Sequence, residues 1–226
     1  MSRRLVLPLG AAIAAVALVA GCGAMRGSSS NPMSFFITSS NPGKGGDLGG
    51  LAGADRFCQS LADKAGAGGK TWRAYLSTAA MNGQPAVNAR DRIGTGPWRN
   101  AKGVVVANSV AELHSPANNL GKQTSLNEKG EVVAGRGDPV NMHDILTGSK
   151  PDGTLAVPAA GQDTTCGNWT RSEGGSAIVG HHDKTGTNPD PVANVSWNAS
   201  HGTRGCSLEQ LKTTGSAGLL YCFAVN

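Results

Sequence analysis

A polar tract contains the residues best suited to bind a metal: His181-His182-Asp183, followed by Asn188, Asp190 and Asn194. Imidazole nitrogens and carboxylate oxygens are common metal ligands. Asn and Asp also favour left-handed and Asx-turn backbone geometry, however, so a tract of this composition is more typical of a solvated loop. The sequence therefore predicts turn formers here, and we assign no metal ligand and no cofactor from it.

Catalysis has weaker support. Ser, His and Asp are all present, but no Gly-x-Ser-x-Gly elbow or similarly positioned nucleophile surrounds them. His114 and His143 are isolated in the sequence, and each is more typical of a surface or hydrogen-bonded histidine than of a general base. The sequence therefore predicts no enzyme and no catalytic residue.

The four tryptophans bear on ligand class, because an exposed indole can stack on a sugar face. Trp72 lies in an alternating segment and Trp169 is close to Cys166, so both are predicted to be core residues. Trp98 and Trp197 are less constrained. Core roles are the commoner ones in a domain this poor in aromatics, but Trp197 stays a candidate ligand contact.

Residues 1–21 are predicted to be a secretion signal. Arg3 and Arg4 precede an apolar stretch that ends in Leu18-Val19-Ala20-Gly21-Cys22, where small residues precede a cysteine. This segment resembles a bacterial lipobox, which implies lipidation of Cys22 and a flexible tether at 22–32. The alternative is a transmembrane helix, but the apolar stretch is short for a span and no stop-transfer segment follows. We expect an exported lipoprotein, anchored in a membrane of the bacterial cell envelope through its lipid.

Composition limits the rest of the chain to one loop-rich domain at 33–226. The chain has 33 glycines and only 4% aromatic residues, which favours a modest core. Its net charge of +5 includes the two signal-peptide arginines, and no Lys/Arg cluster is longer than a dipeptide. We therefore predict no nucleic-acid partner.

Periodicity places the elements that must position these residues. We expect an α+β fold with mixed short strands, two helices and long loops. In chain order, the expected elements are a strand at 34–38, a helix at 51–65, a strand at 72–77, a short helix at 109–113, strands at 176–180 and 195–197, and a closing strand at 219–225. Residues 118–162 are predicted to be a long loop region, because they lack the apolar residues for a core of their own.

This order of elements resembles the C-type-lectin-like fold. Within that fold the chain is similar to the endostatin domain of collagen and to a bacterial lipoprotein family. The matching landmarks are Cys58 in the first helix, Gly148-Ser149-Lys150-Pro151-Asp152-Gly153, Cys166-Gly167-Asn168-Trp169, Cys206, and Cys222 in the closing strand.

The resemblance implies both strand pairing and disulfide pairing. Four cysteines in an oxidising compartment allow three connectivities, and the residues alone do not choose among them. The family's nested pattern implies Cys58–Cys222 and Cys166–Cys206. It also implies that the first and last strands pair.

The resemblance also implies a recognition role. Sugar-binding members of the superfamily hold Ca²⁺ with carboxylate and amide oxygens, whereas this chain has Lys150-Pro151-Asp152 and Trp197-Asn198-Ala199 at the matching places. We therefore expect calcium-independent binding of an extracellular protein or glycan through loops at 140–155 and 181–200. The candidate contacts are Asp152, Asn188, Asp190 and Trp197. The alternative is a structural envelope lipoprotein with no dedicated ligand site.

Overall fold

A computed structural model describes residues 1–2, 31–157 and 162–226 of the chain. The predicted signal peptide, the lipidation site Cys22 and nearly all of the tether lie outside the described residues. Within those ranges, no helix is long and apolar enough to cross a membrane.

The last strand, β8 (Ser216–Ala224), is the centre of the main sheet, whose order is β1-β8-β5-β6-β7. The first strand, β1 (Phe35–Ile37), runs antiparallel to β8, as expected for the first and last strands, and β2 (Trp72–Ala74) pairs antiparallel with the opposite edge of the same end of β8. β5 (Asp144–Leu146) runs parallel to β8. β6 (Ile178–His181) and β7 (His201–Gly202) complete the sheet by antiparallel pairing.

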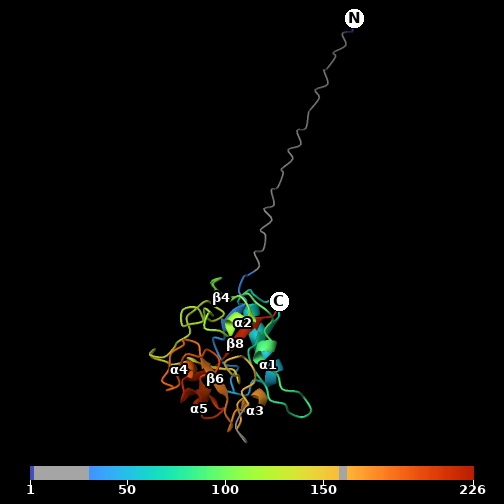
Figure 1. The fold of residues 1–226 in the computed structure, drawn as a ribbon. Helices are drawn as coiled ribbons and strands as arrows, with labels where there is room; N and C mark the ends of the chain where they lie inside the picture. Colours follow the sequence, from blue (N-terminus) through green and yellow to red (C-terminus); the bar gives the residue numbers. More distant parts are fainter. Residues whose placement is uncertain (3–30, 158–161) are drawn as a thin grey trace.

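Both faces of this sheet are covered by apolar cores. Leu220 and Cys222 of β8 belong to one core, with side chains of α1 (Gly50–Lys64), α3 (Cys166–Trp169) and α5 (Leu208–Lys212). Tyr221 and Phe223 belong to the other, with side chains of the β3 (Trp98–Arg99) and β4 (Val105–Ala107) hairpin and of α2 (Val110–Leu113). Because both faces are covered, β8 is an almost continuous apolar run in the sequence. Figure 1 shows how these helices and strands are arranged in the domain.

The two predicted helices are confirmed, but the described residues contain five. α1 begins and ends within a residue of its prediction and places Cys58 on its buried face. α2 has the expected cap, since the Ser109 side chain accepts a hydrogen bond from the Glu112 amide. The helices that periodicity missed are α3, α4 (Pro191–Asn194) and α5, each four or five residues long. So short a helix depends on its cap and its contacts rather than on an apolar stripe.

Two disulfides connect the layers. Cys58–Cys222 joins α1 to β8 with a Cα–Cα distance of 5.6 Å, and Cys166–Cys206 joins α3 to the segment before α5 at 5.7 Å. This is the pairing that the family resemblance implied.

Two element predictions are wrong. Residues 118–162 are not loop throughout, because β5 lies in their middle and pairs on both sides. Residues 195–197 form no strand. They follow α4 in a turn, where the Ser196 carbonyl accepts a hydrogen bond from the His181 amide of β6.

Candidate functional site

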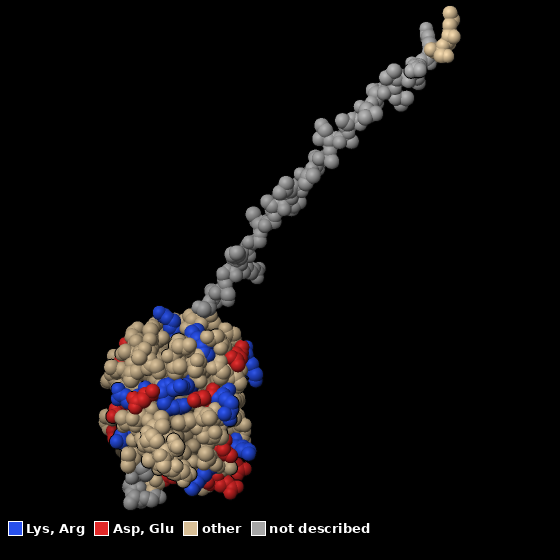
Figure 2. All heavy atoms as spheres, turned by 90° about the vertical axis from the view of Figure 1, so that its right-hand side faces the viewer, with Lys and Arg blue, Asp and Glu red and all other residues tan. Residues whose placement is uncertain are grey.

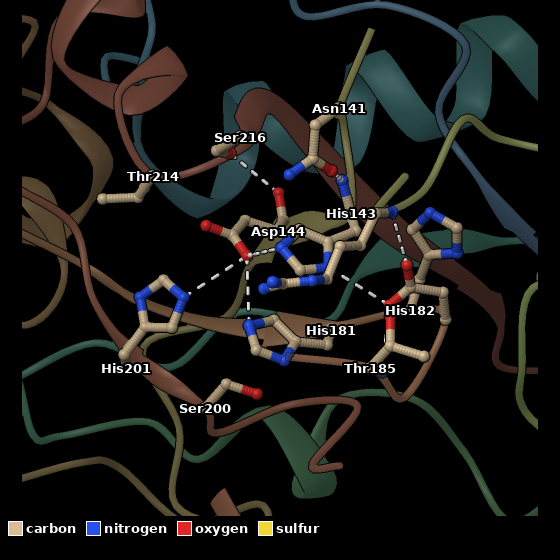
Figure 3. A network of polar contacts seen from close by, with 12 residues as sticks. Asn141, His143, Asp144, His181, His182, Thr185, Ser200, His201, Thr214 and Ser216 are labelled. Carbon is tan, nitrogen blue, oxygen red and sulfur yellow. Dashed lines mark hydrogen bonds and ion pairs between the residues drawn. The ribbon is translucent and has the colours of Figure 1, made fainter. Parts of the chain in front are cut away.

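Four side chains meet where β5, β6 and β7 lie side by side: His143, Asp144, His181 and His201, hereafter the histidine–aspartate cluster (Figure 3). Asp144 opens β5 directly opposite His181, the last residue of β6. His201 is opposite Val179, two residues before His181, so both histidines project from the same face of the sheet. His143 immediately precedes β5. The register of the strands thus brings together residues that lie up to 58 positions apart in the sequence.

One oxygen of Asp144 is the common neighbour of the three imidazoles. Asp144 Oδ1 lies 3.2 Å from Nε2 of His143, 3.3 Å from Nε2 of His181 and 3.5 Å from Nε2 of His201. The carboxylate of Asp144 is 0% exposed, whereas the ring of His201 is 29% exposed. The cluster is therefore buried on three sides and reaches the surface at His201.

The other ring nitrogen of each histidine is committed to an oxygen outside the cluster. Nδ1 of His143 contacts Oδ1 of Asp183 at 3.2 Å. Nδ1 of His181 contacts the Asn194 carbonyl at 2.9 Å, and Nδ1 of His201 contacts the Gly202 carbonyl at 3.2 Å. Carbonyl and carboxylate oxygens only accept, so these ring nitrogens carry the protons.

Asp144 and His201 shift each other's pKa values. Burial raises the pKa of Asp144, but its contacts with the neighbouring imidazoles outweigh burial, so this pKa lies below its ordinary value. The contact with Asp144 raises the pKa of His201. Among the described residues, neither carboxylate oxygen of Asp144 nor Nε2 of His181 has a properly directed hydrogen-bond partner. Such atoms are rare in protein interiors.

Asp183 orients His143 from outside the cluster. Its Oδ2 accepts a hydrogen bond of 2.7 Å from the Arg136 amide, and its Oδ1 accepts one of 3.2 Å from the Thr185 amide. Burial raises the pKa of Asp183, but the His143 contact and the hydrogen bond from the Arg136 amide outweigh burial. The pKa of Asp183 therefore lies well below its ordinary value.

The prediction of solvated turn formers is wrong for His181, His182 and Asp183, which are all buried. It holds for the residues that follow. Asp190 caps α4 by accepting hydrogen bonds from the Val192 and Ala193 amides, and the side-chain Nδ2 of Asn188 donates to the Ser200 carbonyl. His143 was expected to be a surface or hydrogen-bonded histidine; it is buried and hydrogen-bonded to Asp183, and it also belongs to the cluster.

A polar cavity of about 360 Å³ lies over the cluster. Its lining includes His143, His181 and His201 together with Arg136, Asn141 and Asn188. Asn188 is the one predicted ligand contact among these lining residues. The cavity reaches the three histidines of the cluster, behind which the carboxylate of Asp144 is buried.

The remaining predicted contacts lie elsewhere. The carboxylate of Asp152 is exposed and accepts hydrogen bonds from the Thr154 amide and hydroxyl. Trp197 is only 4% exposed, and its indole nitrogen donates to the Leu113 carbonyl. Trp98, the other loosely constrained tryptophan, is also buried. These indoles are core residues and offer no stacking platform.

A second hollow, of about 320 Å³, is lined mainly by residues within 114–118 and 184–198, with Pro151 where the 140–155 tract adjoins. We call it the α4 groove; its lining includes Pro116, Pro151, Val192, Val195 and Trp197. Asn198 joins the tracts, because its side-chain amide lies 3.0 Å from the Lys150 carbonyl and 3.3 Å from the Pro151 carbonyl. Val192 and Val195 are exposed.

No protein-family model matches this chain, and no curated protein is detectably similar to it in sequence. The cluster and the groove are therefore the basis for assigning a function.

Proposed function

We infer that the protein is an exported, lipid-anchored protein of the bacterial cell envelope whose C-type-lectin-like domain is a non-catalytic recognition module for an extracellular protein or glycan. The observation that carries this proposal is the α4 groove. It is formed where the two loop tracts expected to bind a ligand adjoin, and exposed aliphatic side chains line it.

Topology supports the assignment of the fold. β1 pairs with β8, so the first and last strands of the domain are neighbours, and the two disulfides are nested in sequence. The long connections between β2 and β8 then supply the loops in which a recognition surface is built.

The lining of the groove favours a protein ligand over a glycan. Val192 and Val195 present aliphatic side chains, while the one indole that lines the groove is buried. A sugar face needs an exposed aromatic platform or a set of free polar groups, whereas an apolar side chain of a partner protein fits an aliphatic groove.

The expected calcium independence has support in the contacts of Asn198. Its side-chain amide donates to the carbonyls of Lys150 and Pro151, so it ties two loops together. Lys150 places an ammonium where a calcium site needs an oxygen, and Ala199 supplies no carboxylate.

Surface charge does not favour a nucleic-acid partner. On the face drawn in Figure 2, basic and acidic side chains are intermixed rather than gathered into a basic patch. A nucleic-acid site needs a continuous basic surface to neutralise phosphates.

Anchoring is tested at Cys22. We expect Cys22→Ser to move the protein out of the membrane fraction or leave its signal uncleaved, because a thioether-linked lipid needs the thiol. A serine variant that stays membrane-bound and is cleaved at the same place would exclude lipidation.

Recognition is tested with arrays of extracellular matrix proteins and of glycans, probed with and without EDTA. We expect a protein ligand whose binding is lost in Val192→Asp and retained in Val104→Asp, which changes an exposed valine outside the groove lining and outside both loop tracts. A glycan ligand with the same variant dependence would correct the ligand class. Binding to neither array would favour the alternative, a structural envelope lipoprotein without a dedicated ligand site.

A further inference from the structure

We propose that the histidine–aspartate cluster is a binding site for one transition-metal ion, with Zn²⁺ the best fit. The ligands are Nε2 of His143, His181 and His201 and a carboxylate oxygen of Asp144. This site is independent of the recognition role, since the cluster and the α4 groove share no lining residue.

The first step concerns the lone pairs of the imidazoles. Because Nδ1 of each ring donates to an oxygen outside the cluster, Nε2 of each neutral ring carries a lone pair. All three Nε2 atoms then lie 3.2–3.5 Å from the same carboxylate oxygen, although none of them is directed at it as in a hydrogen bond. Lone pairs that face an anion repel it, so a cation is needed among them.

Protons on both His143 and His181 are a poor substitute for that cation. The rings of His143 and His181 are stacked, with centroids 4.3 Å apart and planes 8° from parallel. Protonating both would hold two positive charges face to face in a buried site, where water screens them little. A single divalent ion neutralises the carboxylate and accepts the lone pairs without that repulsion.

The distances from Asp144 agree with those in a tetrahedral zinc site. Zinc bonds of about 2.0–2.1 Å separate neighbouring ligand atoms in a tetrahedron by about 3.3–3.4 Å. The three contacts of Asp144 Oδ1 are 3.2, 3.3 and 3.5 Å. One ligand atom from each of His143, Asp144 and His181 lies within 4.8 Å of the others, whereas His201 lies outside that group. Binding therefore requires the partly exposed ring of His201 to turn inward and the stacked rings of His143 and His181 to tilt toward the ion.

Within the described part of the chain, buried polar atoms that lack a hydrogen-bond partner lie at the proposed metal site. The backbone of Asp144 is fully paired, since its amide donates to the Gly215 carbonyl and its carbonyl accepts from the Ser216 hydroxyl. Its carboxylate oxygens and Nε2 of His181 are buried and have no directed partner among the described residues. A metal ion would complete the coordination of each.

The outer contacts also match a metal site. Histidines that bind zinc donate their second ring nitrogen to a carboxylate or a backbone carbonyl. His143 does so to Asp183, and His181 and His201 do so to carbonyls. Imidazole ligands select ions such as Zn²⁺, Ni²⁺ or Cu²⁺ over Ca²⁺ or Mg²⁺. Four protein ligands leave no open position, as in a structural site.

Thermal unfolding and metal titration test the proposal on the purified full-length protein, stripped with EDTA and dialysed. We expect one equivalent of Zn²⁺ to bind. At a hundredfold excess over Kd, Zn²⁺ should raise the Tm by roughly 5–10 °C. Ca²⁺ should leave the Tm unchanged. Absence of a Zn²⁺-dependent shift in Tm, together with no bound zinc, would overturn the proposal.

Ligand variants locate the site. His201→Gln changes the partly exposed ligand and should fold normally, while weakening Zn²⁺ binding at least about tenfold. His114→Gln removes a histidine outside the cluster and should bind Zn²⁺ as the wild type does. Bound Co²⁺ should give an intense tetrahedral absorption spectrum that His201→Gln alters. If the zinc affinity and the cobalt spectrum are both unchanged in His201→Gln and in His181→Gln, the assignment of these ligands is overturned.

Discussion

Asp183 fixes the orientation of His143, because Oδ1 of Asp183 accepts a hydrogen bond of 3.2 Å from Nδ1 of that ring. Outer partners of this kind raise the basicity of a ligating imidazole and hold its tautomer. We predict that Asp183→Asn weakens Zn²⁺ binding by about 10–100-fold, since a neutral amide polarises the ring less. Competition against a chromophoric chelator measures the change.

Glu173→Gln is the matched control, because Glu173 is exposed and the substitution likewise neutralises one carboxylate. Its zinc affinity should equal that of the wild type. If Asp183→Asn binds Zn²⁺ as tightly as Glu173→Gln, then Asp183 is a structural residue and does not tune the metal site.

His114 should make stability depend on pH. Its Nδ1 contacts the Val110 carbonyl and its Nε2 contacts the Tyr75 hydroxyl, both at 2.8 Å, so the neutral ring is fully paired. Burial lowers the pKa of His114 and is the largest effect. The hydrogen bond to the Val110 carbonyl raises this pKa by less, Arg90 lowers it further, and Asp152 raises it by the smallest amount. The unfolded chain therefore binds this proton first, and folded stability falls as the pH drops through about 6.5.

His114→Gln removes this titration. We expect the loss of unfolding free energy between about pH 7.5 and about pH 5.5 to be smaller in the variant than in the wild type. Urea unfolding at the two pH values measures both losses. Equal losses would show that His114 titrates alike in the folded and unfolded chains.

At the scale of elements, β6 approaches the 197–198 segment too closely for any side chain at Gly180. A Cβ there would overlap the Trp197 carbonyl oxygen and the Asn198 amide nitrogen. We predict that Gly180→Ala lowers the unfolding free energy by at least about 3 kcal/mol, the upper end of the range for overpacking, because the obstacle is backbone. Urea unfolding with an unchanged slope would measure it.

Gly202→Ala on the neighbouring strand β7 is the control for Gly180→Ala. A Cβ at Gly202 meets nothing within 4 Å, so the substitution should change stability by no more than about 1 kcal/mol. Equal stability of the two alanine variants would mean that the 197–198 segment can move away from β6 without cost.

Elements with a pattern of their own could be predicted from the sequence. α1 follows from its apolar spacing, and α2 follows from the cap at Ser109. β5 could not be predicted, because three residues with only two apolar side chains become a strand through pairing with β6 and β8. A strand this short has no periodicity to detect.

The histidine–aspartate cluster was missed for the same reason. His143, His181 and His201 are far apart in the sequence, and only the register of β5, β6 and β7 brings their rings together. The one available signal was that His181 directly follows the strand predicted at 176–180. Trp197 was misjudged because its partner, the Leu113 carbonyl, is 84 residues away.

At the scale of the whole molecule, the two disulfides should differ in how much they stabilise the fold. Cys58–Cys222 spans 164 residues and joins the first helix to the central strand, whereas Cys166–Cys206 spans 40. The loop-closure entropy removed from the unfolded chain is worth about 5 kcal/mol for the first and about 4 kcal/mol for the second. We therefore predict that the paired substitution Cys58→Ala/Cys222→Ala lowers the unfolding free energy about 1 kcal/mol more than Cys166→Ala/Cys206→Ala. Urea unfolding of the two variants under non-reducing conditions measures the difference, and each variant serves as the control for the loss of two thiols. A larger loss for the inner pair would mean that native contacts around Cys166 and Cys206, and not loop length, decide what each bridge contributes.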